Sequence, residues 1–183
     1  TVKEKNIYRN PELGFSIEKP QDWVFMPTAW VLNLKDKAEP FYRELDERVR
    51  YARLPFVYFH YDHGISDLVI PTVQVIYRTT CGTSALDRST ILGMQLVQLQ
   101  IVLDDYCLVE ATSNGVISER PANIIKSTHT VNNQNGKAMD CLSRCYVIFT
   151  EDAMFVVVMS GPTEGAYRCD REFGEILRSI RLG

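Results

Sequence analysis

The stretch from Gly136 to Gly161, GKAMDCLSRCYVIFTEDAMFVVVMSG, constrains the fold more than any other part of the chain. It predicts two long antiparallel strands joined by a short polar turn at Thr150-Glu151-Asp152. The second strand is apolar on both faces, with Met154, Val156 and Val158 on one and Phe155, Val157 and Met159 on the other. Because side chains alternate between the faces of a strand, such a strand needs cover on both sides. We therefore expect it at the centre of a sheet, with helices or loops above and below.

The totals suit one globular domain that spans residues 1–183. Hydrophobic residues make up 45% of the chain and charged residues 23%, and a chain of 183 residues can bury a substantial core. The formal net charge of -3 gives no support for a nucleic-acid partner. We expect no membrane span, because the longest apolar region, residues 91–103, is interrupted by three glutamines. The first residue is Thr1, so we expect a processed or trimmed product.

A long helix is predicted from about Ala85 to Asp104, with Ser84 as its N-cap. One ridge of this helix consists of Leu92, Leu96, Leu99 and Leu103, and an adjoining ridge consists of Met94, Val97 and Ile101. Because the two ridges together form a broad apolar stripe, we expect the helix to be largely buried.

The other predicted elements are a strand at 14–17, a charged surface helix at about 38–52, strands at 106–112 and 124–131 with an Asn114-Gly115 turn between them, and a closing helix at about 164–179. The inward face of the closing helix is predicted to be Ala166, Cys169, Phe173, Ile176, Leu177 and Ile180. Strands and helices in this mixed order favour an α+β fold with a mostly antiparallel sheet.

Cys141 and Cys145 lie on the first strand of the central pair. On an unbroken strand their Cα atoms are roughly 13 Å apart, from a rise of about 3.3 Å per residue. A disulfide needs Cα atoms within about 7 Å, so these two cysteines cannot pair with each other. His129 is expected on the neighbouring strand, where it could form a nucleophilic pair with either thiol. The alternative is inert packing, which is the usual role of a buried cysteine and the one we favour.

Four motifs in this order resemble the PsbP-like proteins, whose fold is shared with the Ran-binding protein Mog. The motifs are Gly14-Phe15-Ser16-Ile17 with Pro20 and Trp23, the strand Pro71-Thr72-Val73-Gln74-Val75 ahead of a long helix, Asn135-Gly136-Lys137-Ala138 with Phe155-Val156-Val157-Val158, and the closing Phe173, Ile176 and Ser179-Ile180. The resemblance covers roughly residues 8–182 and is carried by the order and spacing of these fold-forming residues.

The resemblance implies an α/β/α sandwich around a mostly antiparallel β-sheet. It also implies a non-enzymatic role as a protein-binding or assembly module, and it leans towards an extracytoplasmic or secreted location. The charged helix departs from the common pattern of the family, and we interpret it as a helical insertion near 36–53. Fold alone does not define function.

The strongest polar cluster lies in residues 60–67. His60, Asp62, His63 and Asp67 are side chains that bind zinc, manganese or calcium, and His60 and Asp62 share one strand face. These residues predict a divalent-metal-binding module as an alternative function. The competing interpretation, which we favour, is a solvated strand end and turn, where Asp, Gly and Ser are common, and it requires no cofactor.

Two further surfaces are candidates for binding another protein. Trp30 lies in an irregular segment, and Tyr42 and Arg43 lie on the charged helix. Catalytic signatures are absent from the sequence: there is no G-x-S-x-G elbow, no H-E-x-x-H, no Walker loop and no dinucleotide fingerprint. The sequence therefore favours a non-enzymatic module with a protein partner and leaves the oligomeric state open.

Overall fold

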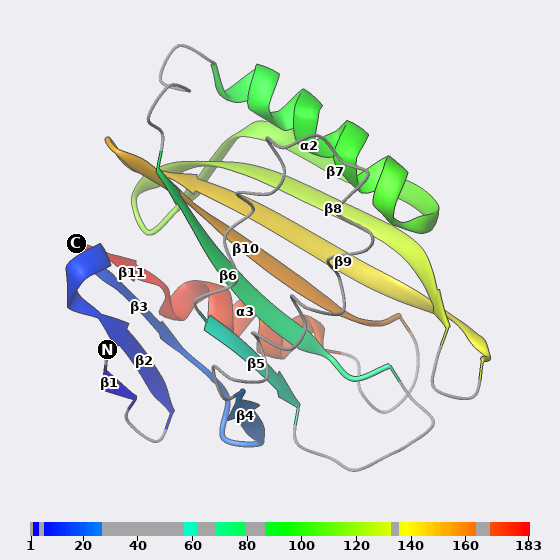
Figure 1. Cartoon of the computed structure of the whole chain (residues 1–183), viewed down its shortest axis with the longest axis horizontal. Helices are drawn as coiled ribbons and strands as arrows, with labels where there is room; N and C mark the ends of the chain where they lie inside the picture. The colour runs from blue at the N-terminus through cyan, green and yellow to red at the C-terminus, as the bar shows by residue number, and fades with distance from the viewer. Residues whose placement is uncertain are drawn as a thin grey trace, which may run out of the picture.

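A computed structural model describes residues 2–3, 6–26, 57–61, 69–79, 87–132, 136–163 and 169–183. Its centre is a seven-stranded sheet (Figure 1). In spatial order the strands are β4 (Trp23–Phe25), β5 (Val57–Tyr61), β6 (Thr72–Thr79), β10 (Ala153–Pro162), β9 (Ala138–Phe149), β8 (Arg120–Asn132) and β7 (Asp104–Ile117). Every pairing among these strands is antiparallel.

The central hairpin confirms the prediction made for residues 136–161. β9 and β10 pair with Phe149 opposite Met154, and the backbone N–H of Thr150 donates to the carbonyl of Ala153 across the turn. β10 lies between β9 and β6 and is almost entirely buried. Its position explains why both of its faces are apolar.

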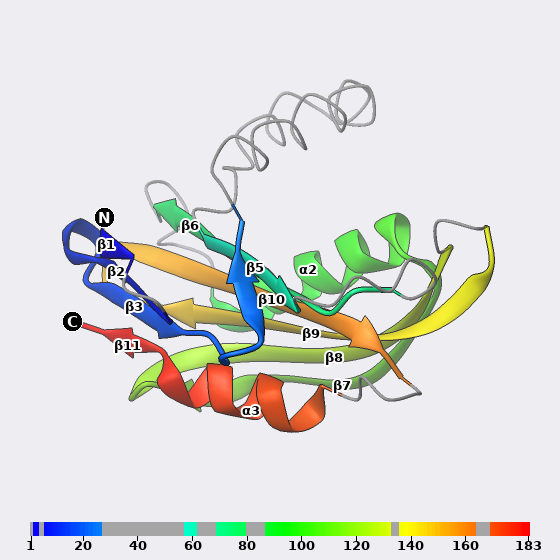
Figure 2. The same cartoon turned by 90° about the horizontal axis from the view of Figure 1, so that it is seen from below.

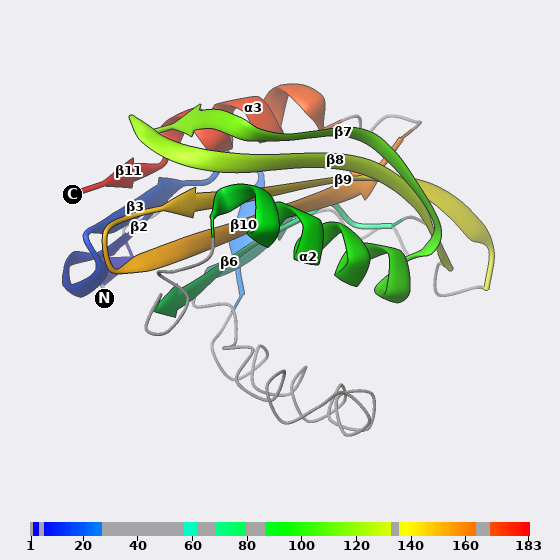
Figure 3. The same cartoon turned by 90° about the horizontal axis from the view of Figure 1, so that it is seen from above.

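The two faces of the sheet are covered by different layers. Helix α2 (Arg88–Val102) lies on one face, and helix α3 (Asp170–Ser179) lies on the opposite face (Figures 2 and 3). The α3 face is also covered by a four-stranded sheet in the order β1 (Val2–Lys3), β2 (Ile7–Asn10), β3 (Phe15–Glu18) and β11 (Arg181–Leu182). The arrangement is an α+β sandwich, as predicted.

The core has one apolar cluster on each side of the sheet. On the α3 side, Phe15 and Ile17 of β3 join Phe173 and Ile176 of α3, which confirms Phe173 and Ile176 as inward residues of the closing helix. Residues 164–168 of that predicted helix, including Ala166, lie outside the described residues. On the α2 side, three leucines of α2 pack against residues of the central hairpin. The short 3-10 helix η1 (Pro11–Leu13) connects β2 to β3.

The predicted N-cap of the long helix is wrong. The helix begins at Arg88, and its N-cap is Asp87, whose carboxylate accepts from the backbone N–H of Thr90 at 2.7 Å. A carboxylate is favoured here because it satisfies a free backbone donor and lies at the positive end of the helix dipole. Ser84 lies outside the described residues.

The predicted turn at Asn114-Gly115 is also wrong, because β7 continues through it to Ile117. The chain turns instead at Ser118 and Glu119, which both have positive φ angles, 49° and 61°. Gly115 serves close packing: a Cβ atom there would lie 2.6 Å from Cδ1 of Ile124. The helix predicted at 38–52 and the insertion near 36–53 lie outside the described residues.

Candidate protein-binding surface

Helix α2 is held against the sheet by polar contacts at its start and leucines along its length. Nδ2 of Asn123 donates to the carbonyl of Arg88 at 2.9 Å, which ties the first turn to β8. Leu92, Leu96 and Leu99 then pack on the apolar cluster formed by β8, β9 and β10. Their spacing of three and four residues places them on one side of the helix.

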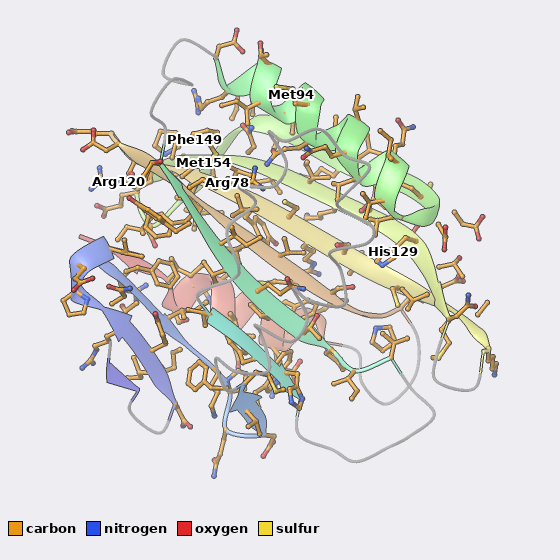
Figure 4. The ribbon with its side chains drawn as sticks, in the orientation of Figure 1. Arg78, Met94, Arg120, His129, Phe149 and Met154 are labelled. Carbon is orange, nitrogen blue, oxygen red and sulfur yellow. The ribbon has the colours of Figure 1, made fainter. Side chains whose placement is uncertain are left out.

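A second apolar ridge points away from the sheet. We call Met94, Val97 and Ile101 the outward ridge; their side chains are 56%, 56% and 69% exposed. At 100° per residue, their spacing places them on the side of the helix opposite to the leucines. The prediction that α2 is largely buried is therefore wrong. The two ridges lie on opposite sides of the helix and do not adjoin, so the sheet covers only one of them. Figure 4 labels Met94 on the helix.

The outward ridge lacks the charges that normally solvate an exposed helix face. The helix sequence RSTILGMQLVQLQIV contains one charged residue, Arg88, at its first position. The residues beside the ridge are Gly93, Gln98 and Gln100. Surface helices of globular proteins usually carry charged residues on their outward side. An apolar, uncharged exposed face is typical of a surface that contacts another molecule.

The outward ridge is next to an exposed edge of the sheet. α2 packs beside β7, which is the last strand of the seven-stranded sheet within the described part of the chain. Leu108 and Val109 of β7 are 46% and 61% exposed. The pairing of β7 with β8 contains three register shifts, which interrupt the strand's regular outline. Such irregularities discourage a second strand from pairing with an edge.

His129 and Cys141 are neighbouring buried polar groups of the sheet. His129 of β8 is opposite Cys141 of β9, so the structure brings together the Cys–His pair considered from the sequence. Burial lowers the pKa of His129, and burial and the neighbouring Asp140 raise the pKa of Cys141 to about 11. Burial raises the pKa of Cys145 to about 12. A neutral thiol is a poor nucleophile, so the pair fits packing rather than catalysis.

A small hollow lies beside the start of α3. It has a volume of about 140 Å³ and is lined partly by Leu142, Cys169 and Phe173. Arg144 forms an ion pair with Asp170 there, and its guanidinium lies 5.7 Å from the ring centroid of Phe173. Burial, together with nearby acidic residues, raises the pKa of Cys169 to about 12. The ion pair and the ring contact join α3 to the sheet.

The predicted metal site remains a prediction. His60 lies on β5, opposite Val24 on one side and Thr72 on the other. Asp62, His63 and Asp67 lie outside the described residues. Among the residues that the structure describes, no three His, Cys, Asp or Glu side chains form a group that could hold a metal ion.

The predicted binding residues Trp30, Tyr42 and Arg43 also lie outside the described residues. The outward ridge was missed from the sequence because its residues were assigned to the core. The sequence nonetheless contained an indication of this surface. A helix with a single charge and two opposite apolar ridges must either be covered on both sides or use one of its apolar sides to contact a partner.

No protein-family model and no curated protein match the sequence. Several solved structures match the fold, and three of them are compared with this chain. LpqN of Mycobacterium tuberculosis, described as involved in cell envelope biogenesis, has 15% identity and a TM-score of 0.55 over 92% of this chain and 82% of that chain. Cyanobacterial PsbP from Synechocystis sp. PCC 6803 has 10% identity and a TM-score of 0.59 over 100% and 95%. The Ran-binding protein Mog1p of Saccharomyces cerevisiae has 12% identity and a TM-score of 0.52 over 99% and 96%.

The fold and the surface together define a sheet-centred α+β domain with one helix that is apolar on both sides. More particularly, the chain has the PsbP/Mog-like fold, as the sequence resemblance implied. Within the described residues, no helix is long and apolar enough to cross a membrane.

Proposed function

We propose that this chain is a non-enzymatic protein-binding module whose contact surface is the outward ridge of α2. The single observation that carries the proposal is the exposure of Met94, Val97 and Ile101 on a helix with no charge beyond its first residue. Exposed apolar patches are rare on monomeric proteins unless they contact something. Covering these side chains removes apolar surface from water, which favours association.

The comparisons and the chemistry of the interior support the same proposal. One protein of this fold, Mog1p, is described as Ran-binding. The buried thiols Cys141, Cys145 and Cys169 have pKa values raised to about 11 or 12, so they are protonated at neutral pH. A non-enzymatic role is consistent with these inert side chains.

The proposal includes an extracytoplasmic location, which the family resemblance implied. LpqN, described as involved in cell envelope biogenesis, has the same fold and supports this part of the proposal. Fractionation of the native host with antibodies to the chain is the direct test. Recovery of the chain in the cytoplasmic fraction alone would contradict the proposed location. It would not contradict the proposed contact surface.

Site-specific photo-crosslinking tests the contact surface. A photoreactive amino acid is placed at Val97 of α2 or, as a control, at Val116 of β7, which is 69% exposed. In extracts of the native host, we expect the variant with the photoreactive residue at position 97 to form protein adducts of discrete mass. The variant with that residue at position 116 should not form the same adducts. Equal labelling from both positions, or no adduct from position 97, would contradict the proposal.

A further inference from the structure

The outward ridge is arranged so that it can pack against a copy of itself. Thr90, Met94, Val97 and Ile101 recur at spacings of four, three and four residues, and all four are exposed. These are the d, a, d and a positions of a heptad seam. We infer that two copies of this chain form a symmetric dimer by antiparallel packing of α2 against α2. The inference rests on the proposed function, since it names the partner of the same surface.

The seam is symmetric about its own centre. In an antiparallel pair centred between Gln95 and Leu96, Met94 of one copy is opposite Val97 of the other, and Ile101 is opposite Thr90. Every a position then meets a d position, which is how the layers of an antiparallel helix pair interlock. A two-fold axis requires one patch that complements itself, and this seam meets that requirement.

The charge distribution favours a second copy over a charged partner. The chain has a net charge of -3, so two copies repel weakly at long range. Beyond Arg88, however, α2 carries no charge that would meet a like charge across the seam. A lipid surface is a poorer occupant, because interfacial helices carry several Lys or Arg residues on their polar side.

Gly93 provides an independent indication that another chain approaches the helix. A glycine inside a helix destabilises it by roughly 1 kcal/mol relative to alanine. A Cβ atom on Gly93 would have no neighbour within 4 Å, so packing within the described chain does not require a glycine there. Gly93 precedes Met94 and flanks the seam, where the missing side chain lets a second helix come close.

The sheet edge is a poorer dimer interface than the helix. β7 begins with Asp104 and Asp105 and also carries Glu110, so a copy of the strand would bring like charges together. Its three register shifts also interrupt regular pairing. Leu108 and Val109 of β7 are also exposed and offer further apolar area.

The size of the contact predicts a modest affinity. Fifteen residues of α2 extend ~22 Å at 1.5 Å per residue. A specific interface needs roughly 1,000 Å² of buried surface in total, and one helix pair lies near this lower limit. We therefore expect a small interface and a dimer that dissociates reversibly on dilution.

Sedimentation equilibrium of the purified full chain tests the inference. We expect an apparent mass that rises with concentration towards twice the 21.0 kDa of the chain. Ile101→Glu and Met94→Glu should weaken the dimer at least about tenfold, because each buries a charge in the seam. Val116→Glu is the matched control, since Val116 and Ile101 are both 69% exposed, and it should dimerise as the wild type does.

Cysteine crosslinking tests the antiparallel register. In a background with Cys81→Ser and Cys107→Ser, chains with Thr90→Cys and chains with Ile101→Cys are mixed and oxidised. We expect disulfide dimers from the mixture and few from Ile101→Cys alone. The reverse preference, or a dimer that survives both glutamate variants, would overturn the inference.

The failure of this inference and of the proposed function can be told apart. A wild-type chain that stays monomeric at every concentration overturns the inference. If Val97 nevertheless crosslinks a different host protein while Val116 does not, the protein-binding function stands without the dimer. If Val97 also gives no adduct in host extracts, both proposals fail.

Discussion

His129 and Cys141 lie opposite each other across the β8–β9 ladder, and both are buried, with 6% and 0% exposure. Within the described part of the chain, Nδ1 of His129 has no hydrogen-bond partner. A buried imidazole without such a partner is held in its neutral form, because charging it would require desolvation of the ion. The protonation of His129 is therefore expected to affect the stability of the fold.

The first prediction concerns the dependence of stability on pH. Burial lowers the pKa of His129 below its ordinary value of 6.5, so the unfolded chain binds the proton more readily than the folded chain. The contribution of His129 to folding is therefore intact above pH 6.5 and is lost as the pH falls below it. Urea unfolding at a series of pH values should show that the free energy of unfolding decreases as the pH is lowered below 6.5.

His129→Gln removes the titrating group and should flatten that pH dependence. His60→Gln is the matched control, because it changes an imidazole on the same sheet in β5. A wild-type and a His129→Gln protein with parallel pH profiles would contradict the assignment of the effect to His129.

The second prediction concerns thiol reactivity. Cys107 is exposed, whereas Cys141, Cys145 and Cys169 are buried with raised pKa values. In the folded protein at pH 7.5, iodoacetamide should modify Cys107 much faster than those three, since the thiolate is the reacting form. Mass spectrometry of tryptic peptides over time measures the four rates. Rapid labelling of Cys141 or Cys145 would mean that the α2 side of the sheet opens readily.

The third prediction compares two glycines. A Cβ atom at Gly115 would lie 2.8 Å from Cγ1 of Ile124 and 2.9 Å from the carbonyl oxygen of Ala122. Gly115→Ala should therefore lower the free energy of unfolding by about 1–3 kcal/mol, the usual effect of overpacking. Gly93→Ala, measured at a concentration where the chain is monomeric, should raise it by about 1 kcal/mol through helix propensity. Equal effects of the two changes would contradict the close packing at Gly115.

The fourth prediction tests the metal hypothesis for His60, Asp62, His63 and Asp67. Metal-stripped protein is melted with calcium, manganese, zinc or magnesium at matched ionic strength. A bound ion at 100 times its dissociation constant should stabilise the fold by about 2.7 kcal/mol. A shift with one ion that disappears in His60→Ala and His63→Ala would establish the site. An unchanged melting temperature with all four ions would remove it.

The central hairpin could be predicted from the sequence because its pattern has one physical solution. A strand with Val156 on one face and Val157 on the other must be covered on both sides, and β10 is buried at the centre of the sheet. Two of the predicted inward residues of α3, Phe173 and Ile176, are its buried residues.

The outward ridge was not predicted by the same reasoning. Hydrophobic periodicity says that Met94, Val97 and Ile101 share one side of a helix, but not whether that side meets the sheet or another molecule. The Asn114-Gly115 pair was wrongly interpreted as a turn. Gly115 lies within β7, where a glycine is needed because Ile124 of the neighbouring strand β8 packs closely against it. Local signals cannot distinguish these uses of a glycine.

The most direct test of the account observes the outward ridge itself. Methionine methyl groups are labelled with carbon-13, and a soluble paramagnetic agent is added to report which methyls reach solvent. Met94 is 56% exposed and Met159 is fully buried, so one chain contains both the reporter and its control. In dilute purified protein, the Met94 signal should be strongly broadened and the Met159 signal should not.

We predict that the Met94 methyl becomes protected when host extract is added or when the purified chain is concentrated, while the Met159 methyl stays unchanged. Protection on concentration alone would support the α2 dimer, and protection only in host extract would support a different protein partner. A Met94 methyl that stays equally accessible under both conditions would contradict the claim that this face of α2 binds protein.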